Sequence, residues 1–187
     1  MVGRVDTLQE EFNNLQATNL QFNNPIEHVK TRLKTPESIA KKLHRRELEV
    51  TAKNARECLT DIAGLRCICS YAKEIKHIAE VFKRQPDLKI LREKNYVDNP
   101  KASGYRSHHL IIEVPIHLTD RTERIPVEVQ IRTQAMDFWA TLEHKVKYKY
   151  NNQMPEHISL DLIECAEKIS ELDRRMYVIQ DIVNLAY

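Results

Sequence analysis

A short segment of the chain, PVEVQIRT at positions 126–133, places an acid, an amide and a base on one side of a predicted strand. Val127, Val129 and Ile131 recur at every second residue, which is typical of a strand with one buried face. The opposite face would carry the polar set Glu128, Gln130 and Arg132. These side chains can accept a proton, bind a cation or hold a phosphate. They could equally be a solvated surface, and alternation alone does not decide between the two.

Asp61 is a second carboxylate that comes just before a predicted strand at 64–70. Carboxylates from distant segments commonly hold Mg²⁺ against a nucleoside triphosphate. The chain has 27 acidic residues, and most of them must be solvated. A magnesium site formed by Asp61 and Glu128 is therefore a hypothesis based on residue type.

The basic segment 28–46 is a candidate phosphate site. Arg32 and Lys34 share one face of a predicted strand, and Ser38 and Lys42 lie one turn apart on the helix that follows. The N-terminus of a helix beside cations suits phosphate oxygens, although a solvated basic surface has the same pattern. Because the chain has only three glycines, a Gly-rich phosphate loop is excluded.

The segment 94–109 combines aromatic and basic residues around one glycine. Its candidates for binding a nucleotide are Lys94, Lys101, Tyr105 and His109. A tyrosine flanked by cations suits stacking on a base while phosphates are held nearby. The alternative is a polar surface loop with Tyr105 packed over it. Farther along, His144 has no second histidine or cysteine one turn away, so we do not expect zinc.

Hydrophobic periodicity predicts the elements that position these residues. The expected strands cover 28–34, 64–70, 88–91, 109–114 and 125–132. The expected helices cover 5–22, 36–46 with a continuation through 47–60, 71–84, 135–148 and 155–185. This order favours the α/β class, with a mixed sheet flanked by helices and with N- and C-terminal helices.

Composition predicts a globular protein. The 187 residues are 42% hydrophobic and 30% charged, with a net charge of +2. We expect an N-terminal helix at 1–24, a catalytic domain at 25–150 and a helical extension at 151–187. No apolar run approaches the roughly 20 residues of a membrane helix. No two cysteines form a C-x-x-C pair, and Cys67 and Cys69 should be small core residues in a cytoplasmic protein.

Four segments together resemble the synthetase domain of the RelA/SpoT family. They are NPIEHVKTRLK (24–34), DIAGLRCIC (61–69), NPKASGYRSHH (99–109) and VEVQIRTQAMDFWATLEHKVKYK (127–149). Their combination is most similar to the small stand-alone alarmone synthetases. The resemblance implies a nucleotidyltransferase-like synthetase domain that makes the stringent-response alarmones ppGpp and pppGpp. In that reaction, pyrophosphate passes from ATP to the 3′-hydroxyl of GDP or GTP, and AMP is released.

The resemblance also implies a role for each candidate. ATP would be bound by Arg32, Lys34, Ser38, Lys42 and Arg66. The guanine nucleotide would be bound by Lys94, Lys101, Tyr105, His109 and Gln130. The catalytic residues would be Asp61, Glu128 and His109, with Mg²⁺ on the two carboxylates. Glu128 would accept the proton of the attacking hydroxyl.

The resemblance further implies a homotetramer, with no membrane and no nucleic acid substrate. His28 and Lys30 stand where some relatives have an aromatic residue and a threonine, and Asp137 stands where some have asparagine. In relatives that bind an alarmone between subunits, positions 28 and 30 help line the cleft, so the departures there argue against activation by pppGpp. Because no histidine is followed by aspartate, the hydrolase activity of longer members is not expected.

Two other functions fit the same basic surfaces. A non-catalytic module that binds RNA or nucleotides would not require Asp61 and Glu128 to converge. A nucleotidyltransferase would pass AMP and release pyrophosphate, whereas the expected reaction releases AMP.

Overall fold

Five strands form one mixed sheet in the order β1-β2-β5-β4-β3. The computed structural model describes residues 25–150 and 153–186. The strands are β1 (Ile26–Leu33), β2 (Ala63–Cys69), β3 (Lys89–Asn95), β4 (His108–His117) and β5 (Thr122–Thr133). Strands β2 and β5 are parallel, and the other neighbours are antiparallel. The predicted α/β class with a mixed sheet is confirmed, while the helix expected at 5–22 lies outside the described residues.

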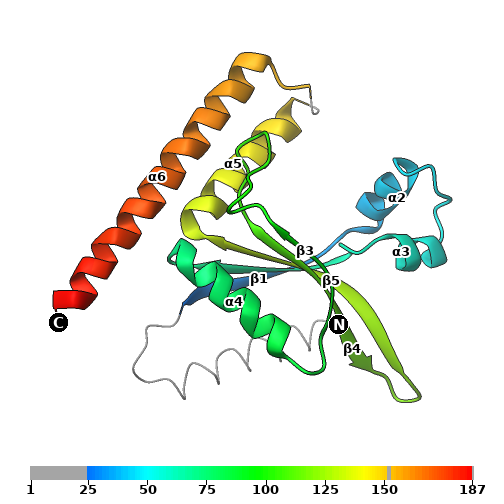
Figure 1. Cartoon of the computed structure of the whole chain (residues 1–187). Helices are drawn as coiled ribbons and strands as arrows, with labels where there is room; N and C mark the ends of the chain where they lie inside the picture. Colours follow the sequence, from blue (N-terminus) through cyan, green and yellow to red (C-terminus); the bar gives the residue numbers. More distant parts are fainter. Residues whose placement is uncertain (1–24, 151–152, 187) are drawn as a thin grey trace.

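Helices flank this sheet on several sides (Figure 1). They are α2 (Pro36–His44), α3 (Ala52–Cys58), α4 (Ala72–Arg84), α5 (Gln134–Lys149) and α6 (Glu156–Ala186). Helix α4 crosses one face of the sheet, α2 and α3 lie together beyond one end of it, and α6 runs alongside α5. No helix in the described ranges has both the length and the apolar character that a membrane span requires.

Two predicted boundaries were wrong. The helix expected to continue through 47–60 is interrupted, because Glu47 adopts a positive φ of 57° and α3 starts afresh after Thr51. The Thr51 side chain caps this new start by accepting a hydrogen bond from the Asn54 amide. The short strand expected at 88–91 continues to Asn95, which brings Lys94 into the sheet.

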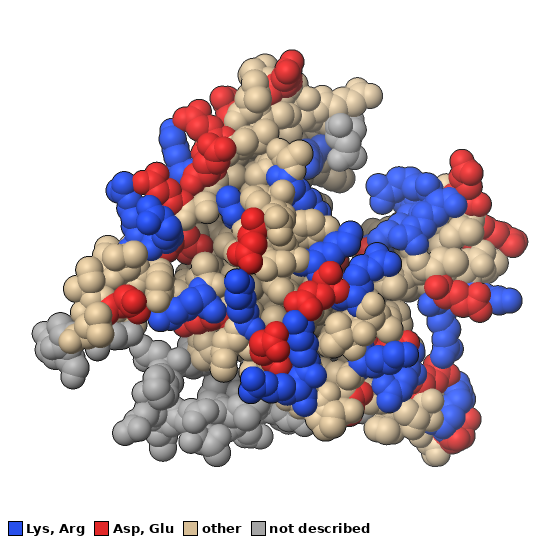
Figure 2. Space-filling model, in the orientation of Figure 1, with Lys and Arg blue, Asp and Glu red and all other residues tan. Residues whose placement is uncertain are grey.

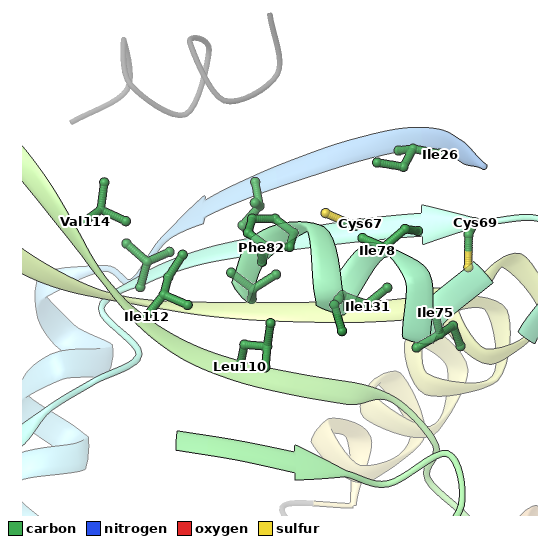
Figure 3. Packing of buried hydrophobic residues seen from close by; sticks show 14 of the residues in the cluster. Ile26, Cys67, Cys69, Ile75, Ile78, Phe82, Leu110, Ile112, Val114 and Ile131 are labelled. Atoms are coloured by element: carbon green, nitrogen blue, oxygen red, sulfur yellow. The ribbon is translucent and has the colours of Figure 1, made fainter. Parts of the chain in front are cut away.

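The main core lies between α4 and the apolar face of the sheet (Figure 3). Helix α4 presents Ile75, Ile78 and Phe82, which are all almost fully buried. They pack on the residues that alternate along β2, β5 and β4, which include Cys67, Val129, Ile131 and Leu110. The alternation predicted for β5 is confirmed, as is the burial of Cys67 and Cys69.

Helix α6 is attached to α5 by specific polar contacts. The Trp139 indole donates to the carbonyl of Leu162 at 2.9 Å. Thr133, which caps α5, donates from its hydroxyl to Asp173 of α6 at 2.6 Å. These bonds fix the start of α5, which lies directly after the polar strand β5.

Candidate active site

The polar face of the sheet carries two rows of side chains that run across the strands. One row joins residues that face each other on all five strands: Lys30, Arg66, Gln130, His109 and Lys94. The next row is Arg32, Gly64, Glu128, Ile111 and Arg92. Strand register therefore brings together residues from four separate segments of the sequence.

A cleft of about 390 Å³ lies over one end of these rows. Six of the predicted site residues line it: Arg32, Lys34, Asp61, Arg66, Glu128 and Gln130. Gly64 contributes part of the floor, because it sits between Arg32 and Glu128 and has no side chain to fill the space. The two predicted metal ligands thus converge on one cavity, which a simple binding module would not require.

Asp61 is held by two lysines at the edge of the cleft. Its Oδ2 atom receives hydrogen bonds from Lys34 Nζ at 2.6 Å and from Lys42 Nζ at 2.5 Å. Burial disfavours the charged carboxylate, but these two bonds together hold the pKa of Asp61 below its ordinary value. Its other oxygen, Oδ1, is buried without a hydrogen-bond partner. Asp61 is therefore ionised and has an oxygen free for a ligand.

Glu128 is oriented by two neighbours on the same face. Gln130 Nε2 donates to Glu128 Oε2 at 3.1 Å, and His109 Nδ1 lies 3.4 Å from Glu128 Oε1. The second separation is long for a hydrogen bond, as is common in catalytic sites without substrate. The interaction with His109, assisted by Gln130, keeps the pKa of Glu128 low against burial and the nearby charge of Asp61. Glu128 is therefore ionised and able to accept a proton.

Asp61 and Glu128 fit a magnesium ion. Both offer hard carboxylate oxygens to one cleft, and the unpartnered Oδ1 of Asp61 is an open coordination position. Within the part of the chain that the structure describes, no group of three or more acidic, histidine or cysteine side chains forms a complete metal cage. Two carboxylates suffice for Mg²⁺, because substrate phosphates and water usually supply its remaining ligands.

Tyr105 and Arg132 continue the polar network behind Glu128. Arg132 donates to the Tyr105 hydroxyl at 2.8 Å and also to the side-chain oxygen of Gln130. The Tyr105 hydroxyl in turn lies 2.9 Å from His109 Nε2. Glu128, His109, Tyr105, Arg132 and Gln130 therefore form a closed ring of contacts. Their positions in the site depend on one another.

Asp137 is a site residue whose importance the sequence did not reveal. It lies in the first turn of α5, is buried, and contacts three cations: Lys30 at 3.2 Å, Arg66 at 3.1 Å and Arg132 at 3.2 Å. Lys30 and Asp137 are both positions at which this chain differs from some relatives, and here they form an ion pair. Such a paired departure was the one available signal.

The loop after β3 places a lysine between two aromatic rings. Lys101 Nζ lies 4.8 Å from the ring centroid of Tyr96 and 4.7 Å from that of Tyr105. These distances allow cation–π attraction, which orders the ammonium group. Arg132 lies 5.4 Å from the Tyr105 centroid. The predicted stacking of Tyr105 on guanine thus remains a prediction, and it requires Lys101 to make room.

The other predicted ligands lie around the cleft rather than in its lining. Ser38 is exposed at the start of α2, where its hydroxyl and amide contact Thr35. Lys42 reaches the site through Asp61, and Lys94 through its place in the row beside His109. Figure 2 shows lysine and arginine side chains gathered over α2. The structure thus adds a basic border to the cleft, on the side where ATP phosphates are expected.

Comparisons with known proteins point to one family. The region found in RelA / SpoT proteins matches residues 31–153. GTP pyrophosphokinase YwaC of Bacillus subtilis (strain 168) is 47% identical over 178 residues, which cover 94% of this chain and 85% of that protein.

Solved structures agree with this match. Small alarmone synthetase 2 from Bacillus subtilis is similar at a TM-score of 0.85 and 44% identity, over 95% of this chain and 93% of that one. Small alarmone synthetase 1 from the same organism, bound to its product pppGpp, is similar at a TM-score of 0.87 and 33% identity, over 97% and 93%.

Proposed function

Because the chain belongs to the RelA/SpoT family and is a GTP pyrophosphokinase, we propose that its polar cleft transfers pyrophosphate from ATP to the 3′-hydroxyl of GDP or GTP. The observation that carries this proposal is the convergence of Asp61 and Glu128 on a cleft bordered by cations. The products are AMP and ppGpp or pppGpp. No other reaction of this family is needed to account for the residues of the cleft.

Glu128 is the proposed general base. The 3′-oxygen of the guanine nucleotide attacks the β-phosphorus of ATP, and its proton passes to the ionised Glu128 carboxylate. A new bond forms between the 3′-oxygen and the β-phosphorus. The bond between the β-phosphorus and the oxygen bridging to the α-phosphate breaks, and that oxygen leaves with AMP. Gln130 and His109 support the carboxylate during this transfer.

Mg²⁺, held by Asp61 and Glu128, would neutralise charge on the phosphate oxygens when it is bound. The lysines that now contact Asp61 serve the same end. Lys34 and Lys42 are the cations nearest to this carboxylate, so they are placed to take phosphate oxygens once Asp61 binds the metal. Ser38 and the first turn of α2 would add donors for a phosphate.

Arginines and the aromatic loop are the proposed base-binding groups. Arg32 and Arg66 line the cleft from neighbouring strands and offer planar guanidinium groups for adenine. The guanine nucleotide would lie toward Lys94, Lys101 and Tyr105, with His109 between the two halves of the site. This division places the acceptor hydroxyl beside Glu128.

The test is to incubate the protein with labelled ATP, Mg²⁺ and GDP or GTP and to separate the products. AMP and a 3′-pyrophosphorylated guanine nucleotide are expected. Free pyrophosphate would instead show that AMP is transferred.

Glu128→Gln should lower turnover by about 10³-fold or more, because an amide is a poor base and a weaker metal ligand. Glu164→Gln makes the same change on the surface of α6 and should leave turnover unchanged. Near wild-type turnover by Glu128→Gln would overturn the assignment of the base.

Self-association as a homotetramer is also proposed. Its support is a stripe of apolar side chains on α6 that are about half exposed or more: Leu172, Met176, Ile179, Ile182 and Val183. Exposed apolar surface of this extent commonly marks an interface. Sedimentation equilibrium tests the state, and a monomer at micromolar concentration would contradict it.

We place the enzyme in the cytoplasm, where ATP and GTP are available and thiols stay reduced. All four cysteines of the chain are unpaired, which agrees with a reducing compartment. The division at residues 24 and 150 into a terminal helix, a catalytic domain and an extension remains a prediction. Synthesis without hydrolysis by these residues is likewise proposed, and incubation with pppGpp and Mn²⁺ or Mg²⁺ tests it.

A further inference from the structure

An unbroken series of contacts runs from α5 to the proposed base and passes through the Tyr105 hydroxyl. Asp137 contacts Arg132, and Arg132 donates to Tyr105 Oη at 2.8 Å. Tyr105 Oη lies 2.9 Å from His109 Nε2. His109 Nδ1 then faces Glu128 Oε1 at 3.4 Å. Four consecutive contacts thus connect a buried carboxylate in α5 with the carboxylate that accepts the substrate proton.

The chemistry of the first donor fixes the direction of the others. A guanidinium group can only donate, so the Tyr105 oxygen must accept from Arg132. The single proton of the tyrosine is then free to be donated to His109 Nε2. A neutral imidazole that accepts at Nε2 carries its own proton on Nδ1, and Nδ1 is the nitrogen that faces Glu128. Each group therefore donates toward the carboxylate.

We propose that the Tyr105 hydroxyl is a positioning group that holds His109 in the Nδ1–H tautomer and thereby keeps Glu128 oriented for the attacking 3′-hydroxyl. The role given to Glu128 rests on the proposed function, whereas the tautomer of His109 does not. This role of the hydroxyl is separate from the predicted stacking of the Tyr105 ring on guanine.

The surroundings of Tyr105 make its hydroxyl a fixed donor. Its ring packs against Trp139 and Leu162, which belong to α5 and α6. The preceding residue, Gly104, has a φ of 85° and approaches α6 so closely that a Cβ atom there would lie 2.6 Å from that of Ala166. Burial raises the pKa of Tyr105, although Arg132 opposes this, so the hydroxyl keeps its proton.

The other tautomer of His109 would work against catalysis. With the proton on Nε2, the Nδ1 lone pair would face the Glu128 carboxylate and repel it. Glu128 would keep its bond from Gln130 but lose its second support. A carboxylate with one support samples more rotamers, and the fraction in the reactive position falls.

Removal of the hydroxyl tests the proposal. Tyr105→Phe keeps the ring and should lower kcat about ten- to hundredfold, as loss of an orienting partner typically does. The KM for the guanine nucleotide should change less than about twofold, because the ring remains. Tyr148→Phe makes the same change at an exposed position of α5 and is the control. A Tyr105→Phe enzyme with wild-type kcat overturns the proposal.

The tautomer can be measured directly on the ligand-free protein by ¹⁵N NMR of the histidine rings. At about pH 8.5, histidine side chains are ordinarily neutral. The chain has eight histidines, so the signal of His109 is identified by its loss in His109→Gln. We expect the Nδ1–H form in the wild type and a mixture in Tyr105→Phe.

An Nε2–H form in the wild type, or an unchanged Nδ1–H form in Tyr105→Phe, contradicts the proposal. This holds even if the enzyme were to make a different product. The measurement on the wild type also needs no variant to fold.

Discussion

The two faces of the central sheet are built from the same strands but are held together by different forces. On the α4 face, Leu65, Cys67 and Val129 pack as apolar side chains that water does not reach. On the cleft face, their chain neighbours Arg66 and Gln130 belong to a network of ion pairs and hydrogen bonds. One face is stabilised by buried apolar area, and the other by specific partners.

This difference teaches where stability and function reside. Apolar packing tolerates exchange among side chains of similar volume and costs little at a distance from the substituted residue. A closed polar network fails when one member is lost, because the remaining buried groups are left without partners. Substitutions on the two faces should therefore separate the free energy of unfolding from catalytic turnover.

The largest expected effect is on the α4 face. Phe82→Ala removes an almost fully buried ring and should lower the free energy of unfolding by about 3–5 kcal/mol. Because Phe82 does not touch the cleft, kcat per folded molecule should stay within about twofold of wild type. Urea denaturation and assays at low temperature measure the two quantities. Tyr148→Ala, at a largely exposed ring, should change stability by less than about 0.5 kcal/mol.

Asp137→Asn should produce the next largest effect, and it should act on both quantities. Loss of its charge leaves Lys30, Arg66 and the buried Arg132 without a counter-charge, at a cost of about 2–3 kcal/mol. Turnover should also fall, because Arg132 holds Tyr105. Asp161→Asn, an exposed change on α6, is the matched control.

A double substitution sharpens this prediction. Some relatives carry asparagine at position 137 and threonine at position 30, so the negative charge and one positive charge are absent together. Lys30→Thr combined with Asp137→Asn should recover at least a third of the stability lost in the single variant. Additive losses in this cycle would show that Lys30 and Asp137 do not interact in solution.

Local sequence patterns predicted each face but not their connections. Alternation identified which side of β5 is buried, and motif resemblance marked Asp61, Glu128 and Tyr105. The contacts of Asp137 span 71 residues to Arg66 and 107 to Lys30, so no local pattern could predict them. Strand β3 was predicted too short because, as a mostly exposed edge strand, it shows no alternation beyond Leu91. The break at Glu47 has no glycine or proline to mark it.

The ionic part of the cleft face should be sensitive to pH, whereas the α4 face should not. The pKa of Asp61 is lowered in the folded protein, so its pairing stabilises the fold above its ordinary unfolded pKa and is lost as pH falls through the folded value. Asp61→Asn should cost about 1–2 kcal/mol at pH 7, because burial and Glu128 offset part of the gain.

This difference from wild type should shrink below about pH 4. Urea denaturation of both proteins between pH 3 and pH 8 measures it, with Asp161→Asn as the control for charge loss. A difference that stays constant across this range would show that the lysine pair does not stabilise the charged carboxylate.

The smallest expected effect compares neighbouring residues of β2 that point to opposite faces. Gly64→Ala adds a Cβ that would lie 3.8 Å from the carbonyl oxygens of Arg32 and Glu128, so the strand can accept it. Stability should rise by about 0.5 kcal/mol, because glycine is entropically unfavourable in a strand. The KM for ATP should rise about fivefold, since the methyl group occupies the floor of the cleft.

Ala63→Gly is the reverse change on the α4 face, where Ala63 is buried. It should lower the free energy of unfolding by about 1 kcal/mol through the lost methyl group and the added chain entropy. The KM for ATP should stay within about twofold of the wild-type value, because Ala63 points away from the cleft. If both variants shift KM alike, adjacent positions of β2 are not separated by face, and the cleft does not bind ATP over Gly64.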